Sequence, residues 1–145
     1  MNVVRELVNK GADMEVTDEM GWTPLHWASY NGRLNVVQFL VDNKAEVNAK
    51  GSRGWTLLHD ASSNGHLDVV KFLVESKADI HAKKKFGWTP LHVASAFGHL
   101  DVVKFLVENK ARIHAKNKFG WTPLDIAKRR NKTSVADYLN SKGGI

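Results

Sequence analysis

Histidine spacing is the feature of this sequence that comes closest to a chemical site. His26, His59 and His92 recur at intervals of 33 residues, and imidazole is a common zinc ligand. If each belongs to one unit of a stack, equivalent side chains lie on the order of 10 Å apart, whereas zinc ligands converge to about 2 Å from one ion. The three cannot share a metal ion, and we predict that each bonds to a turn of the neighbouring unit.

Candidate nucleophiles follow the same interval. Ser29, Ser62 and Ser95 recur with the repeat, so they belong to the fold rather than to one active site. Catalysis needs a nucleophile, a base and an orienting group in one pocket. The sequence has no glycine-rich phosphate loop, no His-Glu-x-x-His pair and no Gly-x-Ser-x-Gly elbow. We therefore expect no enzyme activity, no cofactor and no metal site.

Four tryptophans also share this spacing: Trp22, Trp55, Trp88 and Trp121. If exposed and in register, they would form an aromatic ridge. Tryptophan is enriched in interaction hot spots because it buries a large area at little entropic cost. Duplication of one ancestral unit would repeat the residue equally well, without any role in contact. The spacing leaves both interpretations open.

Length and composition indicate what kind of domain must position these residues. The chain has 145 residues, of which 43% are hydrophobic and 25% charged, as in one folded globular domain. It has no cysteine, which excludes disulfides and fits a reducing compartment, so we expect a cytoplasmic or nuclear location. No stretch approaches the roughly 20 apolar residues that cross a bilayer, and we expect no membrane insertion.

An internal repeat organises the whole chain. Gly-Trp-Thr begins at Gly21, Gly54, Gly87 and Gly120, always 33 residues apart. The period predicts a single repeat domain, 1–145. It divides into an N-terminal half repeat, three full repeats and a C-terminal capping repeat: 1–20, 21–53, 54–86, 87–119 and 120–145.

Each unit predicts two short helices and a turn. In the first full repeat, Thr23 and Pro24 form a helix start, because the hydroxyl caps free amides and proline at the first helical position loses no hydrogen bond. Gly32 ends this first helix after about seven residues. The helical apolar spacing of 67–75 in the next repeat predicts an amphipathic second helix. Neither helix is long enough to be stable alone, so stacked neighbours must supply the core.

The segments Thr23-Pro24-Leu25-His26-Trp27-Ala28 and Thr89-Pro90-Leu91-His92-Val93-Ala94 match the Thr-Pro-Leu-His-x-Ala signature of ankyrin repeats. The chain thus resembles an ankyrin-repeat protein over nearly its whole length. The resemblance implies an all-α solenoid of stacked antiparallel helix pairs with projecting hairpin-like loops. It also implies protein binding through a concave face formed by the loops and the first helices.

Departures from the signature carry their own predictions. Leu57 replaces the proline of the second full repeat and Asp60 puts a charge at a usually packed position, so we expect local weakness there. Lys44, Lys77 and Lys110 stand where the motif has glycine, and each must tolerate a positive φ at a cost of roughly 1 kcal/mol.

The N-terminal half repeat has an apolar second-helix stripe, including Val4 and Leu7, without a first helix before it. We expect either part of a longer array or a minimal cap. Its uncovered apolar surface predicts weak self-association of an otherwise monomeric protein.

Positions that differ between the repeats are where a shared scaffold acquires specificity. The loop tips and the exposed part of the first helices carry most of these positions. With the tryptophans, they form the predicted partner-binding set: Met20, Trp22, Tyr30, Arg53, Trp55, Lys85, Phe86, Trp88, Phe97, Lys118, Phe119 and Trp121.

Charge indicates the kind of partner. Residues 1–53 carry six Lys or Arg against seven Asp or Glu, while 54–145 carry fifteen against eight. An acidic protein surface is therefore the favoured partner of this non-catalytic interaction module. The basic groups 83–85 and 128–132 could instead bind nucleic acid or another polyanion, which we favour less than an acidic protein. They could also be a solvated face without a partner. A structural spacer or an engineered scaffold without a dedicated partner remains the alternative function.

Overall fold

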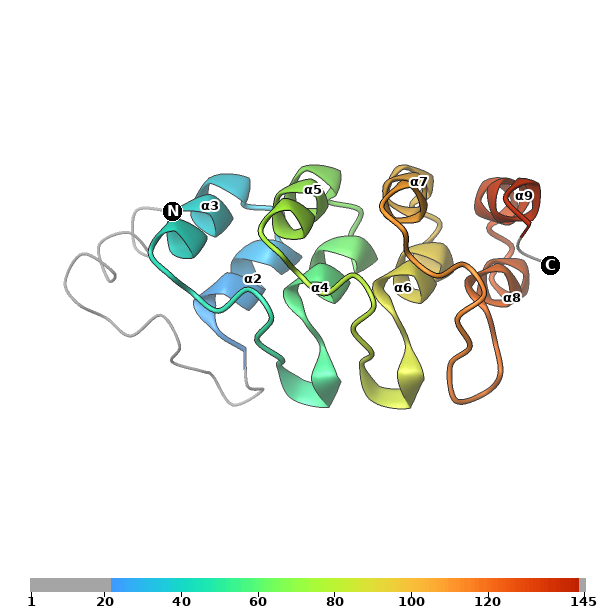
Figure 1. Ribbon diagram of the computed structural model, residues 1–145, viewed down its shortest axis with the longest axis horizontal. Coiled ribbons are helices and arrows are strands. Elements are labelled where there is room, and N and C mark those ends of the chain that lie inside the picture. The colour runs from blue at the N-terminus through green and yellow to red at the C-terminus, as the bar shows by residue number, and fades with distance from the viewer. Residues whose placement is uncertain (1–21, 144–145) are drawn as a thin grey trace.

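The computed structural model describes residues 22–143, and over this range the chain forms eight α-helices and no strand (Figure 1). The helices alternate between a first and a second helix of each repeat. The first helices are α2 (Pro24–Tyr30), α4 (Leu57–Ser63), α6 (Pro90–Phe97) and α8 (Pro123–Arg129). The second helices are α3 (Leu34–Asp42), α5 (Leu67–Glu75), α7 (Leu100–Glu108) and α9 (Thr133–Ser141).

The helices lie in two layers with loops projecting from one of them. Figure 1 shows the second helices in one row, the first helices in a row beneath, and the connecting loops extending away below. Two loop tips contain one turn of 3-10 helix, η1 (Ser52–Gly54) and η2 (Lys85–Gly87). The predicted all-α solenoid of stacked helix pairs is confirmed. Each described pair lies within one predicted repeat, and the exact repeat boundaries stay a prediction.

Threonine begins every first helix, as predicted. The Thr89 hydroxyl accepts the backbone N–H of His92 at 3.3 Å, and the His92 ring nitrogen Nδ1 accepts the Thr89 backbone N–H at 3.2 Å. This reciprocal capping box satisfies two amides that the helix itself leaves free. The same box recurs at Thr23, Thr56 and Thr122, with Asp125 replacing histidine in the last repeat.

Left-handed backbone follows each of the second helices α3, α5 and α7. Lys44, Lys77 and Lys110 have φ of 72°, 77° and 77°, which confirms the predicted positive φ at these non-glycine positions. Gly65, after the first helix α4, has a φ of 70°, and a Cβ there would lie 2.6 Å from Nδ1 of His99. Glycine at 65 therefore serves both the turn and the close approach of the next repeat.

Leucine, valine and alanine from both helix layers form one continuous core along the stack. Its largest members are fully buried, and they come from every described repeat: Leu25, Leu40, Leu57, Leu58, Leu73, Leu91, Leu106 and Leu139. Leu57, which replaces proline, is 0% exposed. Neighbouring repeats thus supply the burial that no single helix pair achieves alone.

Histidines connect the repeats by hydrogen bonds. Nε2 of His59 lies 2.8 Å from the Trp88 carbonyl oxygen, and Nε2 of His92 lies 2.8 Å from that of Trp121. His26 makes the equivalent contact at 3.3 Å. The predicted bond from each histidine to the neighbouring turn is confirmed. Because Nδ1 is held by the capping box, each ring joins a helix start to the next loop.

Candidate protein-interaction surface

Loop tips and the outward sides of α2, α4, α6 and α8 form one surface, called here the first-helix face. The last two described loops are joined on it, since the Lys118 backbone N–H donates to the Phe86 carbonyl oxygen at 2.9 Å. Phe86 itself has a φ of 66°, an uncommon conformation for an aromatic residue. The tips of these two loops are therefore held together rather than being independent turns.

The repeated tryptophans are half-buried on this face. Trp22, Trp55, Trp88 and Trp121 all have intermediate exposure, so the fully exposed ridge considered from the sequence is not what the structure shows. Their backbone carbonyls at 55, 88 and 121 accept the interrepeat histidine bonds, which holds each residue close to the preceding helix. Part of every indole remains accessible for contact.

Other aromatic side chains are more exposed than these tryptophans. Tyr30 is 41% exposed, Phe86 46%, Phe97 50% and Phe119 55%, and all four belong to the predicted binding set. Trp27, at 46%, does not. The equivalent residue of a later repeat is Val93, which is smaller and buried. The size of Trp27 relative to its counterparts could have identified it from the sequence.

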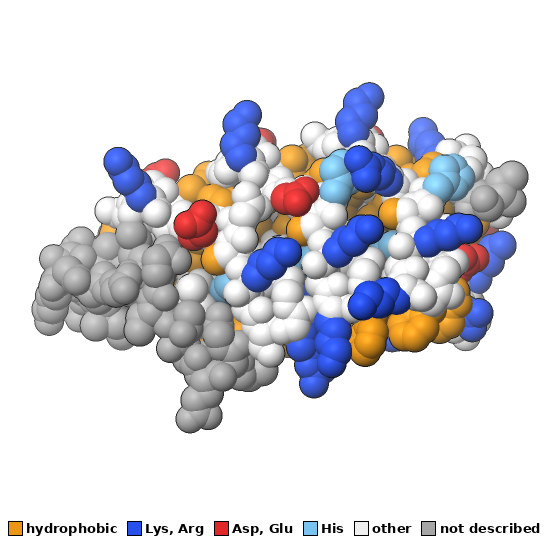
Figure 2. All heavy atoms as spheres, turned by 60° about the horizontal axis from the view of Figure 1, so that its bottom comes forward, with side chains coloured by type: hydrophobic (Ala, Val, Ile, Leu, Met, Phe, Trp, Pro, Cys, Tyr) orange, Lys and Arg blue, Asp and Glu red, His pale blue; other side chains and the backbone are white. Residues whose placement is uncertain are grey.

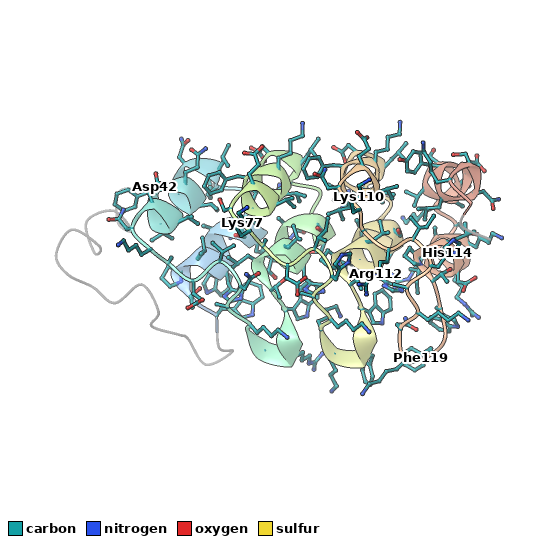
Figure 3. The ribbon with its side chains drawn as sticks, viewed as in Figure 1. Asp42, Lys77, Lys110, Arg112, His114 and Phe119 are labelled. Carbon is teal, nitrogen blue, oxygen red and sulfur yellow. The ribbon has the colours of Figure 1, made fainter. Side chains whose placement is uncertain are left out.

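The aromatic residues form two groups along the stack. Near one end, the rings of Trp22 and Tyr30 have centroids 5.5 Å apart, and those of Trp22 and Trp27 are 4.8 Å apart. Toward the other end, Phe119 lies 5.6 Å from Phe86 and 5.2 Å from Trp121. Figure 3 places Phe119 at the tip of the last projecting loop.

Met20, the remaining aliphatic member of the predicted binding set, lies outside the described residues.

The second group borders a hollow of about 400 Å³. Residues from three consecutive predicted repeats line it, and five belong to the predicted binding set: Trp55, Phe86, Trp88, Phe97 and Phe119. Lys84 and Arg130 add positive charge at its wall. We call this hollow the aromatic pocket. Trp22 and Tyr30 are not part of it.

Lys84 lies between two indoles. Its Nζ is 4.7 Å from the ring centroid of Trp55 and 5.3 Å from that of Trp88, within the range of cation–π attraction. Burial lowers the pKa of Lys84, and the positive charge of Arg53 lowers it further. The sequence identified the basic run 83–85 but gave no indication that one of its members lies between tryptophans.

Further cations surround the pocket. The guanidinium carbon of Arg129 lies 4.1 Å from the Trp121 ring centroid, and Lys85 Nζ lies 5.1 Å from that of Phe86. Arg53 and Lys118 are exposed at loop tips. Figure 2 shows hydrophobic side chains gathered beside Lys and Arg near these tips. The predicted basic residues therefore share one face with the exposed aromatic ones.

Asn117 supports the last loop and was not identified from the sequence. Its Oδ1 accepts the backbone N–H groups of Phe119 at 2.9 Å and Trp121 at 3.1 Å, and the residue is 5% exposed. Asparagine commonly stabilises turns by such local bonds. The sequence signal was an asparagine at a position of the repeat where the preceding repeat has Lys84.

Asp60 is the one acidic residue among the described first helices that is fully buried, at 0% exposure. Neither of its carboxylate oxygens has a hydrogen-bond partner within residues 22–143. Burial raises the pKa of Asp60 from 3.8 to about 8, so it is mostly protonated at neutral pH. It cannot serve as a surface charge for a partner.

Among residues 22–143, no three His, Cys, Asp or Glu side chains are grouped so as to hold a metal ion. None of the helices in that range is both long and apolar enough to cross a bilayer.

Paired helices, capped by threonine and joined by histidine across the described repeats, define a stacked-repeat protein. The family described as ankyrin repeats in three copies matches residues 1–84 and 76–145. The chain therefore belongs to the ankyrin-repeat family, whose members are generally non-catalytic protein interaction modules.

Similarity to a curated protein is limited to about one repeat. A protein called VAPYRIN-LIKE, from Medicago truncatula, is 41% identical over 34 residues. The match covers 23% of this chain and 7% of that protein. This match supports membership of the repeat family and does not identify a partner.

Proposed function

We propose that this protein binds an acidic surface of a partner protein through the first-helix face, at its loop tips and first helices. The aromatic pocket is the observation that carries the proposal. None of the residues that line it is acidic, two are cationic, and the rest are apolar. Buried aromatic anchors surrounded by charged side chains are typical of interaction hot spots.

Charge on this face would guide the partner as well as hold it. Complementary charge accelerates association and selects against partners of like sign. Lys85, Lys118 and Arg130 are exposed there, and each is free to approach a carboxylate. The contribution of such rim charges to affinity is modest, so the apolar pocket must supply most of the binding free energy.

Affinity capture from a lysate of the source organism tests the proposal. One variant carries Lys85→Gln, Lys118→Gln and Arg130→Gln on the first-helix face. Its matched control carries Lys44→Gln, Lys77→Gln and Lys110→Gln, which removes the same charge at the ends of the second helices (Figure 3 labels Lys77 and Lys110). We expect a protein that the wild type and the control retain and the first variant loses.

Two other outcomes would redirect the assignment. Equal retention by both variants would exclude the three cations of the first-helix face from the contact. No retained protein would favour a spacer or scaffold without a partner. Binding of heparin and single-stranded DNA with a steep salt dependence, lost in the first variant alone, would favour a polyanion as the partner.

A further inference from the structure

The aromatic pocket is large enough for side chains of a short segment. Its volume of about 400 Å³ falls at the lower end of the roughly 300–1,000 Å³ that ligand pockets occupy. Phe97 and Phe119 at its border are half exposed, while Val93 at its base is buried. An apolar side chain entering here would cover these rings and contact a floor that is already packed.

Cationic groups from two different repeats line this pocket. Lys84 comes from the loop before α6, and Arg130 follows the end of α8. Among the residues that the structure describes, no acidic side chain lines the pocket beside Lys84. A carboxylate brought close to Lys84 would therefore meet uncompensated positive charge in a partly desolvated place, where attraction is stronger than in bulk water.

Flat stacking of nucleic acid bases is disfavoured by the way the rings are already used. Trp55 and Trp88 share the Lys84 ammonium, and Arg129 lies over Trp121. Phe119 is tilted by 40° against Phe86 and by 35° against Trp121. What remains is a hollow of ring edges and aliphatic groups, which suits an apolar side chain better than a stacked base.

We propose that the aromatic pocket binds a linear peptide segment of the partner, with an apolar side chain seated between Trp88, Phe97 and Phe119 and carboxylates on either side approaching Lys84 and Arg130. This inference rests on the proposed function and gives the partner a chemical class. The segment is short and acidic, and it carries its apolar anchor between the acids.

Selection from random peptides displayed on phage tests this class directly, with the whole chain as the target. We expect the enriched peptides to share one apolar residue with Asp or Glu within a few positions on both sides. A synthetic peptide of the enriched sequence, labelled for fluorescence anisotropy, then serves as the probe. Phe97→Ala should weaken its binding by about tenfold or more. Arg130→Gln, which removes an exposed charge, should weaken it by about two- to fivefold.

Matched controls separate the pocket from the rest of the surface. Lys71→Ala on α5 and Lys110→Gln at the end of α7 remove exposed side chains of the second helices, outside the pocket and the first-helix face. Both should bind the probe as the wild type does. Far-ultraviolet circular dichroism checks that all four variants fold, which their exposed positions favour.

Several results would overturn the inference. These are enrichment of peptides without the acidic and apolar pattern, equal loss of binding in variants and controls, or no enrichment at all. Tighter binding of labelled single-stranded DNA than of any peptide would also overturn it and assign the pocket to nucleic acid. If peptide selection fails while the charge variant still loses a captured protein, the proposed function stands and only the linear segment is refuted.

Discussion

Replacing Asp60 tests how a buried carboxyl group governs the stability of the stack. The folded chain holds a proton on Asp60 up to a pKa of about 8, whereas its ordinary value is 3.8. Between these values the native state binds more protons than the unfolded chain, so the free energy of unfolding falls as pH rises and levels off above about pH 8. Asp60 therefore weakens the protein most in alkaline solution.

Histidine restricts the useful pH window. Burial lowers the pKa of His59 from 6.5 to about 4 and also lowers that of His92. Both rings stay neutral in the folded state while the unfolded chain takes up protons, so their effect is a loss of stability as pH falls below 6.5. At pH 6.5 the unfolded histidines are still half protonated, and they lose that charge as pH rises, so the effect of Asp60 between pH 6.5 and 8 is the difference between the wild type and an Asp60 variant.

The expected magnitude follows from the two Asp60 values. Since one pH unit corresponds to about 1.4 kcal/mol per proton, and titration begins near pH 8, Asp60 alone should make unfolding easier by about 1.7 kcal/mol between pH 6.5 and 8. Asp60→Asn should remove this contribution. Asp60→Val, which introduces the residue found at the equivalent Val93, should abolish it and raise stability at every pH in the window.

Urea denaturation followed by circular dichroism at pH 6.5 and 8 measures the effect. Asp137→Asn, at an exposed acid on α9, is the control and should keep the wild-type slope. Parallel pH profiles for the wild type and Asp60→Asn would refute the argument, because they would mean that Asp60 ionises at its ordinary pKa in the folded chain.

Three further predictions concern the capping, turn and aromatic positions. His59→Ala, which removes the capping contact to Thr56 and the 2.8 Å bond to the Trp88 carbonyl, should lower the free energy of unfolding by about 2–3 kcal/mol and flatten the acid side of the stability profile in urea denaturation. Lys110→Gly should raise stability by about 0.5–1 kcal/mol because it relieves a φ of 77°, while Lys104→Gly inside α7 should lower it by about 1 kcal/mol; a loss in both would contradict the turn argument. Trp27→Phe should remove the tryptophan fluorescence that acrylamide quenches most readily, since Trp27 is 46% exposed, and unchanged quenching would show that another indole dominates.

Local rules and the repeat period predicted much of the fold. The helix starts at threonine, the positive φ of the repeated lysines and the contact of His92 with the next turn all depend on residues whose relative positions the 33-residue period fixes. These interactions act either within one repeat or between equivalent positions of adjacent repeats. The single sequence contains enough information to predict the interactions of either kind.

The candidate site was predicted less completely, because it depends on how loops from different repeats pack. Sequence spacing placed the tryptophans on one face but could not show that they are half-buried, nor that Lys84 lies between two of them. The same limit applies to Asn117 and Trp27, whose exposure depends on the size and contacts of their neighbours. Side-chain packing decides these points, and the period does not encode it.

Duplication and selection for binding need not be competing explanations of the repeated tryptophans. Trp55 and Trp88 are held in place by the repeat architecture, through carbonyl bonds to His26 and His59, and the same two residues form a wall of the aromatic pocket. Phe97 and Arg130 occupy a position of the repeat where the other two described repeats have Asn31 and Asn64. The repeat thus supplies a constant wall, and the variable positions supply the rim that distinguishes this pocket from the equivalent surface of the neighbouring repeats.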